Sequence, residues 1–178
     1  MTKINPGLFY GILCGLSMSA WVLMEFALGF HTTSIEIGQY SGYFSIVFPI
    51  IYIYLALHSR QAQHNNTLTA IEGINTGFRL SFFCAIVLTL FFYLYNAYIN
   101  PDWINATIEW QRKRLIASGA TDDEIGRFME QNQTQNGSFG QTIMGFISVV
   151  GIGVLITLIE VPIIRKFFTT RYPDIAKA

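Results

Sequence analysis

Two acidic residues lie inside long apolar segments of this 178-residue chain, and they are the first candidates for chemistry. Glu25 belongs to the segment 7–30 and Glu160 to the segment 141–164. Ionisable side chains within membrane spans are rare and often mark proton or ion pathways. At 1.5 Å per helical residue we expect Glu25 roughly 10 Å outside the bilayer midplane and Glu160 roughly 12 Å inside it. Two interpretations stay open for each: a functional intramembrane acid, or a carboxylate that reaches its nearest interface by snorkelling.

Other reactive side chains lack a spacing that predicts a site. His31, His58 and His64 are not placed near carboxylates or cysteines at metal-ligand spacing, so solvated or interfacial histidines are expected. Cys14 and Cys84 lie in apolar runs and are interpreted as packing residues. Phosphate-binding, nucleophile-elbow and zinc-protease motifs are missing from the sequence. We expect no enzymatic activity, no cofactor and no metal.

Composition favours a membrane protein over a soluble one. Hydrophobic residues make up 52% of the chain and charged residues 12%, and the formal net charge is zero. The mean hydropathy is +0.40. A soluble chain of this length would lack the interior to bury so much apolar surface, and a neutral balance gives no reason to expect a nucleic-acid partner. The lipid bilayer is the first expected partner.

Four apolar runs are long enough to cross a hydrocarbon core about 30 Å thick as helices. The sequence therefore predicts an all-α fold, a polytopic membrane four-helix bundle in a single domain. The predicted spans are 7–30, 40–58, 76–99 and 141–164.

Capping residues predict where some of these helices begin. Asn5 is a candidate N-cap, with Pro6 at the first helical position. Thr69 and Glu72 have the spacing of a capping box, which predicts that the third helix starts near Ala70, before its apolar span.

Two prolines predict irregular helices in the second and fourth spans. Pro49 should kink a short second helix, and Pro162 should kink or end the fourth. Ser138 and Gln141 form a second candidate capping box at the start of the fourth helix.

The distribution of Lys and Arg predicts the orientation. With four spans, both termini lie on one side of the membrane. That side would hold seven of the eleven basic residues, whereas the segment 100–140 holds four together with six acids. The positive-inside rule then predicts cytoplasmic termini and a periplasmic 100–140 segment, in a bacterial inner membrane.

The segment 100–140 is expected to form an extramembrane helical hairpin between the third and fourth spans. A first helix from Asn100–Pro101 to about Ser118 would be capped by Gly119, and a second would start with a Thr121–Glu124 capping box. The apolar stripes of the two helices could pack on each other. The stretch 131–140 is predicted to be a flexible return to the membrane. The stripe residues are Ile104, Ile108 and Leu115 on the first helix, and Ile125, Phe128 and Met129 on the second.

Trp103, Trp110 and Arg114 lie on a different face of the first hairpin helix and are candidate interface or partner contacts. The tryptophans could anchor the hairpin on lipid headgroups, Trp110 could stack with Arg114, or the group could bind a partner. These alternatives stay open.

Gly7, Gly11, Gly15 and Ser19 recur every four residues, the small-residue pattern that allows close approach of two helices in lipid. This stripe is a candidate helix-packing surface, either against another span of the same chain or between copies in a homo-oligomer. Small residues 145–153 on the fourth span could be its internal mate. Gly11→Leu would destabilise the fold in the first case and only dissociate oligomers in the second.

The chain resembles the four-helix inner-membrane proteins of Bacteroidota grouped as domain of unknown function 4199. The resemblance depends on the Tyr98–Asp102 segment Y-I-N-P-D, the following helix with Glu109, the Gly119–Ile125 turn, and a last span ending in Arg165 and Lys166. It implies the same four-helix architecture. Because that family has no established activity, it implies no catalytic or binding residue, and Glu25 and Glu160 are not associated with it.

Two functions are therefore expected from the sequence. The first is a structural or interaction component of the cell envelope, which binds another envelope membrane protein or a second copy through the 100–140 hairpin. The alternative is a small oligomeric transporter or channel that uses Glu25 or Glu160. A polar cavity joining either acid to water would favour the alternative.

Overall fold

The structure is a computed structural model that describes residues 5–63, 67–135 and 139–171. All regular elements in those ranges are helical, which confirms the all-α prediction. They are α1 Pro6–Ala27, α2 Ile35–Phe44, α3 Val47–Gln63, α4 Ala70–Leu94, the π-helical turn η1 Tyr95–Ile99, α5 Trp103–Ala117, α6 Asp122–Gln135 and α7 Phe139–Arg171.

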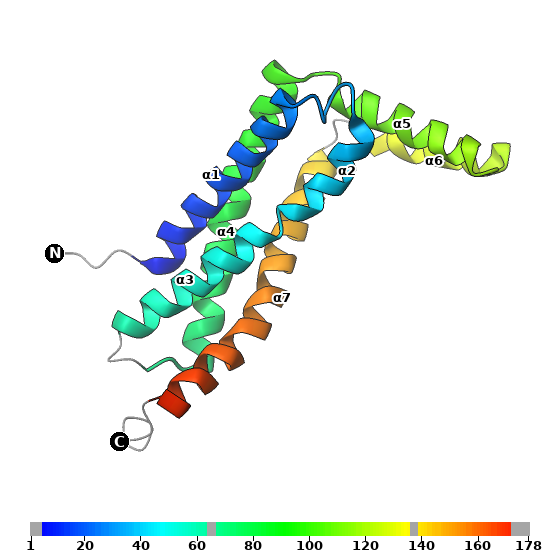
Figure 1. Cartoon of the computed structure of the whole chain (residues 1–178). Helices are drawn as coiled ribbons and strands as arrows, with labels where there is room; N and C mark the ends of the chain where they lie inside the picture. Colours follow the sequence, from blue (N-terminus) through cyan, green and yellow to red (C-terminus); the bar gives the residue numbers. More distant parts are fainter. Residues whose placement is uncertain (1–4, 64–66, 136–138, 172–178) are drawn as a thin grey trace.

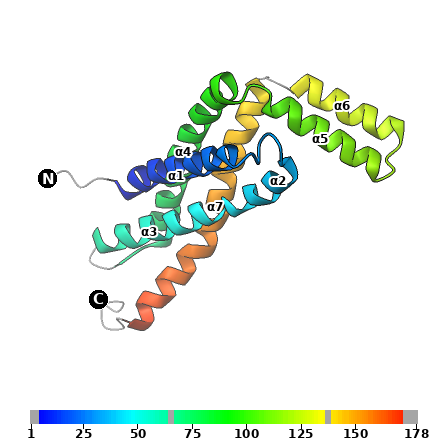
Figure 2. The ribbon, with the colours of Figure 1, turned by 45° about the horizontal axis from the view of Figure 1, so that its top comes forward.

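Within the described part of the chain, four helical segments are long and apolar enough to cross a membrane. They comprise Pro6–Ala27, Ile35–Gln63, Ala70–Ile99 and Thr142–Lys166. α4 contacts α1, α3 and α7 and so occupies the centre of the bundle, while α5 and α6 pack on each other and project from one end of it (Figures 1 and 2). Large apolar side chains such as Leu90, Leu155 and Ile159 are exposed on the outside of the bundle, as a lipid environment requires.

Local capping explains two helix starts. The Asn5 side chain accepts a hydrogen bond from the Gly7 amide at 3.0 Å, with Pro6 at the first helical position of α1. At the start of α4, the Glu72 amide donates to the Thr69 hydroxyl and the Thr69 amide donates to the Glu72 carboxylate. Both bonds of the predicted capping box are therefore present, and α4 begins at Ala70 before its most apolar part.

The second span is longer than predicted and is interrupted close to the proline that was expected to kink it. It extends over 29 residues, Ile35–Gln63, instead of 40–58. The interruption lies at Ser45 and Ile46, one turn before Pro49. Proline has no amide to donate to the Ser45 carbonyl, so the Phe48 amide donates to it instead, and the preceding turn tightens into i to i−3 bonds. The break separates α2 from α3.

The fourth span does not end at Pro162. α7 continues through this proline to Arg171, so the alternative of a helix end is wrong. Gln141 lies within α7, but Ser138, its predicted capping partner, lies outside the described residues.

The small-residue stripe of α1 packs against α4. A Cβ added at Gly11 would lie 2.6 Å from the Leu80 carbonyl oxygen, and one added at Gly15 would lie 2.6 Å from Val87 Cβ. The internal-packing interpretation therefore describes this fold, but the mate is α4 rather than the fourth span. On α7, a Cβ added at Gly145 or Gly151 would meet no atom within 4 Å among the described residues.

A second small-residue contact, which the sequence analysis missed, joins α4 to α7. Gly73 faces Val161, Gly77 faces Thr157, and Ser81 faces Gly153. The signal was present in the sequence, since Gly73, Gly77 and Ser81 also recur every four residues. α4 thus carries a small-residue face toward α7 and receives the glycine stripe of α1 on another face, which accounts for its central position.

The hairpin forms as two helices, with differences at its ends. α5 ends at Ala117, and Gly119 follows with a φ of +82°, the left-handed conformation that favours glycine after a helix. Thr121 and Glu124 make both hydrogen bonds of the predicted capping box. α6 continues to Gln135, so the first half of the predicted flexible return, 131–135, is helical instead. The six predicted stripe residues are all partly buried.

Candidate functional site

A buried polar cluster gathers around Glu25 near the end of the bundle from which the hairpin projects. Only 2% of Glu25 is exposed. Its Oε1 accepts hydrogen bonds from Trp21 Nε1 at 2.8 Å and from the Ser41 hydroxyl, and its Oε2 lies 3.3 Å from His31 Nε2. Glu25 is therefore a well-partnered acid rather than a snorkelling one.

The cluster continues from His31 to Tyr95 and Asn100. His31 is 5% exposed and Tyr95 is completely buried. His31 Nδ1 and the Tyr95 hydroxyl are 2.7 Å apart, and Asn100 Nδ2 donates to the same hydroxyl at 3.3 Å and to the His31 carbonyl at 3.4 Å. Glu25 and His31 come from one part of the sequence and Tyr95 and Asn100 from another, and the four side chains thus form one chain of polar contacts.

One arrangement of protons satisfies every contact in this chain. A neutral imidazole carries one donor and one acceptor nitrogen. If Nε2 of His31 carries the proton, it donates to Glu25, while Nδ1 accepts the Tyr95 hydroxyl proton. The Tyr95 oxygen then accepts from Asn100. In this arrangement His31 is neutral. Its Nε2 proton faces the Glu25 carboxylate, and its Nδ1 faces the Tyr95 phenol.

Burial governs the electrostatics of His31. Desolvation lowers the pKa of His31 below its usual value of 6.5, and the nearby Glu25 carboxylate acts in the opposite direction. The net shift is downward, so the imidazole is neutral at pH 7. This agrees with the single-proton arrangement above.

Two irregular backbone segments bring the cluster together. α1 stops at Ala27, and Gly29, with a φ of +79°, begins a tight loop in which the amides of Thr32, Thr33 and Ser34 all donate to the Gly29 carbonyl. His31 projects from this loop. At the end of α4 the Asn100 amide donates to the Tyr95 carbonyl, an i to i−5 bond that defines the π-helical turn before Pro101. This turn also brings the side-chain amide of Asn100 back to the Tyr95 hydroxyl.

Trp103, at the start of α5, packs on the cluster. Its ring lies 5.2 Å from His31, 6.1 Å from Phe92 and 5.9 Å from Tyr95, measured between centroids. The first residue of the hairpin is therefore fixed to residues of the membrane spans. Trp110 and Arg114, by contrast, lie further along α5, where the Arg114 guanidinium carbon is 5.4 Å from the centre of the Trp110 ring.

The structure does not bring Glu160 to this cluster. The groups within hydrogen-bond or ion-pair distance of Glu25 belong to α1, α2 and the loop between them. Oε2 of Glu160 is buried and has no hydrogen-bond partner among the described residues. The two acids are separate features.

One expectation about histidines is wrong, and several residues of the cluster were missed. His31 was expected to be solvated or interfacial, and the solvated alternative is wrong, because the loop after α1 packs the ring against Glu25 and Tyr95. His64 lies outside the described residues. Ser41, Tyr95 and Asn100 carry no local motif, and only the Glu25 to His31 spacing of six residues could have suggested a pair.

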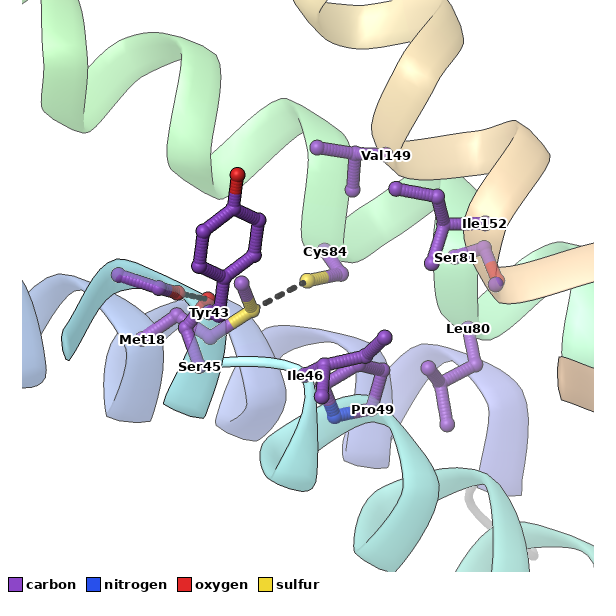
Figure 3. A pocket seen from close by; sticks show the side chains of 12 residues that line it. Met18, Tyr43, Ser45, Ile46, Pro49, Leu80, Ser81, Cys84, Val149 and Ile152 are labelled. Carbon is purple, nitrogen blue, oxygen red and sulfur yellow. Dashed lines mark hydrogen bonds between the residues drawn. The ribbon is translucent and has the colours of Figure 1, made fainter. Parts of the chain in front are cut away.

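An apolar cavity lies between the spans near the α2–α3 break. It has a volume of about 270 Å³, and its lining comes from α1, the α2–α3 segment, α4 and α7 (Figure 3). Met18 reaches across it toward Cys84, with 3.9 Å between the two sulfur atoms. Cys14 and Cys84 are both buried and free. The other lining residues include Ile46, Pro49, Leu80, Val149 and Ile152.

A second, more polar cavity lies between α2 and the hairpin. Its volume is about 540 Å³. The residues that line it are Gln39, Tyr40 and Tyr43 of α2, Trp110, Gln111, Arg114, Leu115 and Ser118 at or near α5, and Phe128 of α6. Neither Glu25 nor Glu160 lines either cavity.

Comparison with known proteins gives a family and no activity. A family model described as "Protein of unknown function (DUF4199)" matches residues 9–166, most of the chain. No curated protein and no solved structure matches. Within the described residues, no group of three or more His, Cys, Asp or Glu side chains is arranged to hold a metal ion.

Proposed function

The chain belongs to the DUF4199 family of proteins of unknown function, and from this premise and its four apolar spans we propose that it is a structural or interaction component of a bacterial inner membrane. In this proposal both termini are cytoplasmic, the hairpin is periplasmic, and the role is not enzymatic. The hairpin binds another envelope membrane protein or a second copy of the chain.

The observation that supports the proposal is how the hairpin is attached to the rest of the protein. Its first residue, Trp103, packs on His31, Phe92 and Tyr95, whereas the rest of α5 and α6 projects beyond the four spans (Figure 2). Ordered helices that leave the body of a protein present a large, pre-formed surface to a partner, at a lower entropic cost than a flexible loop would.

The outer surface of α6 is the part of the hairpin to test. Asp123 and Arg127 form an ion pair at 2.9 Å with highly exposed side chains, and Gly126 between them has no neighbour within 4 Å of an added Cβ among the described residues. This surface has no packing role in the fold, so changes there should leave the bundle intact.

Photocrosslinking in native membranes tests the proposal. A photoreactive residue at Asp123 or Arg127 should give a discrete adduct of defined mass, whereas the same residue at Leu155, which is exposed on the lipid-facing side of α7, should not. Charge reversal of both α6 residues should weaken the adduct formed from a neighbouring position. If no position on α6 gives an adduct and deletion of the hairpin has no phenotype, the proposal is wrong.

A second candidate function is a small oligomeric carrier that uses Glu25 or Glu160. The hydrogen-bonded chain from Glu25 through His31 to Tyr95 favours it, since such chains can pass protons. Proton flux into vesicles that contain the purified protein tests it. Glu25→Gln and Glu160→Gln should each be compared with the unmodified protein, and equal flux in all three, at the level of empty vesicles, would eliminate this candidate.

A further inference from the structure

The two cavities share one lining residue and differ in polarity. Tyr43 lines both of them, and Figure 3 shows it beside the apolar cavity with its hydroxyl directed away from Pro49. The apolar cavity is lined by residues of the membrane spans. The polar cavity is lined by α5, α6 and the earlier part of α2, and so lies closer to the hairpin. Together they form a site that is apolar at span depth and polar beside the hairpin.

The polar cavity has the charge of an anion site. Arg114 is its charged lining residue, and no carboxylate among the described residues lines it. The nearest acid along α5, Glu109, is occupied elsewhere, with Arg112 Nε at 2.8 Å and Lys113 Nζ at 4.0 Å. Arg114 instead lies over Trp110. A guanidinium held by stacking keeps its N–H groups available for a phosphate.

The aromatic residues of the site match the level of lipid headgroups. Tyr40, Tyr43 and Trp110 surround the polar cavity, and amphipathic rings of this kind prefer the membrane–water interface. The apolar cavity below contains a methionine and branched aliphatic side chains, which suit an acyl chain. The volumes of about 540 and 270 Å³ are near the range of about 300–1,000 Å³ typical of small-molecule sites.

The packing of α2 leaves its surface open to an occupant. α2 has no buried residue, and the break at Ser45 and Ile46 separates it from α3, which does pack on α1, α4 and α7. An apolar helix in a membrane span gains stability from close contacts. A ligand seated between α2, α7 and α5 would supply contacts that the chain itself does not.

We propose that this two-part site binds one glycerophospholipid with an anionic headgroup. The phosphate lies at Arg114, the glycerol region lies beside Tyr43 and Trp110, and one acyl chain enters the apolar cavity past Ile152. The site goes beyond the interaction role proposed above, because it requires no protein partner and can be tested on the purified chain.

Native mass spectrometry of the purified protein tests the headgroup. The protein is taken from nanodiscs that contain equal amounts of phosphatidylglycerol and phosphatidylcholine with identical acyl chains. The unmodified protein should retain phosphatidylglycerol preferentially. Arg114→Gln should lower the ratio of retained phosphatidylglycerol to phosphatidylcholine by about fivefold, the effect of one cation beside an anionic headgroup. Lys113→Gln, with the same charge change on the same helix outside the cavity, should not.

A second pair of variants tests the acyl chain. Ile152→Trp should fill the apolar cavity and lower the retention of both lipids, whereas Ile159→Trp, on an exposed part of α7 that does not line the cavity, should leave it unchanged. Circular dichroism establishes that each variant is folded. Equal retention of the two lipids by the unmodified protein would overturn the proposal. So would equal ratios in the Arg114 and Lys113 variants, or equal retention in the two tryptophan variants.

Discussion

The polar atoms of Glu25, His31 and Tyr95 can be buried because each has a partner in the cluster. An unpartnered polar group in a protein interior costs free energy comparable to a lost hydrogen bond or more. Here the carboxylate receives donors from Trp21, Ser41 and His31, and the imidazole lies between Glu25 and Tyr95. The network therefore stabilises the fold as a unit, and it joins α1, α2, η1 and the start of the hairpin.

Removal of the Tyr95 hydroxyl should show how much the stability of the fold depends on this network. Tyr95→Phe leaves His31 Nδ1 and Asn100 Nδ2 without their shared partner at a completely buried position. We expect the free energy of unfolding to fall by about 1–3 kcal/mol. Tyr98→Phe, on the same π-helical turn but 77% exposed, should change it little. Unfolding in mixed detergent micelles measures both, and equal stability of the two variants would contradict the role given to the Tyr95 hydroxyl.

The lowered pKa of His31 predicts how stability depends on pH. Since the folded-state pKa lies below the unfolded value of about 6.5, the unfolded chain binds more protons between these two values. Stability is then complete above about pH 6.5 and is lost as the pH falls through that window. Thermal unfolding between pH 5 and pH 8 measures the slope. His31→Gln should remove this contribution, whereas His58→Gln, on α3 and remote from the cluster, should keep it.

At the level of helices, two small-residue contacts place α4 between α1 and α7. At both contacts, atoms of the neighbouring helix leave no room for a Cβ on the glycines. On the α1 side the close neighbours of the glycines include backbone carbonyl oxygens of α4, such as that of Leu80. On the α7 side the close neighbours of Gly73 and Gly77 are the side chains of Val161 and Thr157. Backbone atoms cannot rotate away, so the α1 contact should be the less tolerant of the two.

Gly11→Ala tests this intolerance. A Cβ 2.6 Å from the Leu80 carbonyl oxygen forces the helices apart, and overpacking of this kind costs about 1–3 kcal/mol. Gly151→Ala adds the same methyl group to α7, where nothing among the described residues lies within 4 Å of it, and should be neutral or slightly stabilising. Thermal unfolding of both variants in the same detergent decides the matter. If Gly11→Ala is as stable as Gly151→Ala, the packing assigned to the glycine stripe is incorrect.

At the scale of the whole molecule, the ends of α1 and α7 and the hairpin lie at opposite ends of the bundle. The last described turn of α7 and the start of α1 lie at one end of the bundle, and the hairpin projects at the other (Figure 1). The end with the helix termini also carries the ion pair between Arg60 and Glu72, with 3.6 Å between the charged atoms. An even number of spans gives this separation whichever way the protein is inserted.

Reporter fusions test the direction of insertion that the distribution of Lys and Arg predicts. A fusion after Ala178 should report the cytoplasm, and an insertion at Gly119, in the turn between α5 and α6, should report the periplasm. An enzyme that is active only in the periplasm serves as one reporter, and a fluorescent protein that matures in the cytoplasm serves as the other. The opposite pattern would show that the positive-inside argument fails for this chain.

The sequence was most informative where a structural feature depends on residues close together in the chain. The capping box at Thr69 and Glu72, the glycine at position 119 and the apolar runs each depend on a short segment, because hydrogen bonds at helix ends and transfer into lipid are local properties. The sequence was less informative about helix interruptions. Pro49 indicated an irregular helix. The position of the break, at Ser45 and Ile46, depended on the hydrogen bond between the Phe48 amide and the Ser45 carbonyl.

Only the tertiary structure decided which residues act together. Glu25 and Tyr95 are 70 positions apart in the sequence, and His31 becomes buried only because a loop after α1 and a π-helical turn after α4 meet at one end of the bundle. The same holds for the mate of the glycine stripe and for the two cavities that share Tyr43. The amino-acid sequence by itself determined four apolar helices and a capped hairpin, since burial in lipid and helix capping act over a few residues. The partners of Glu25 depended on how those helices pack, which no local pattern specifies.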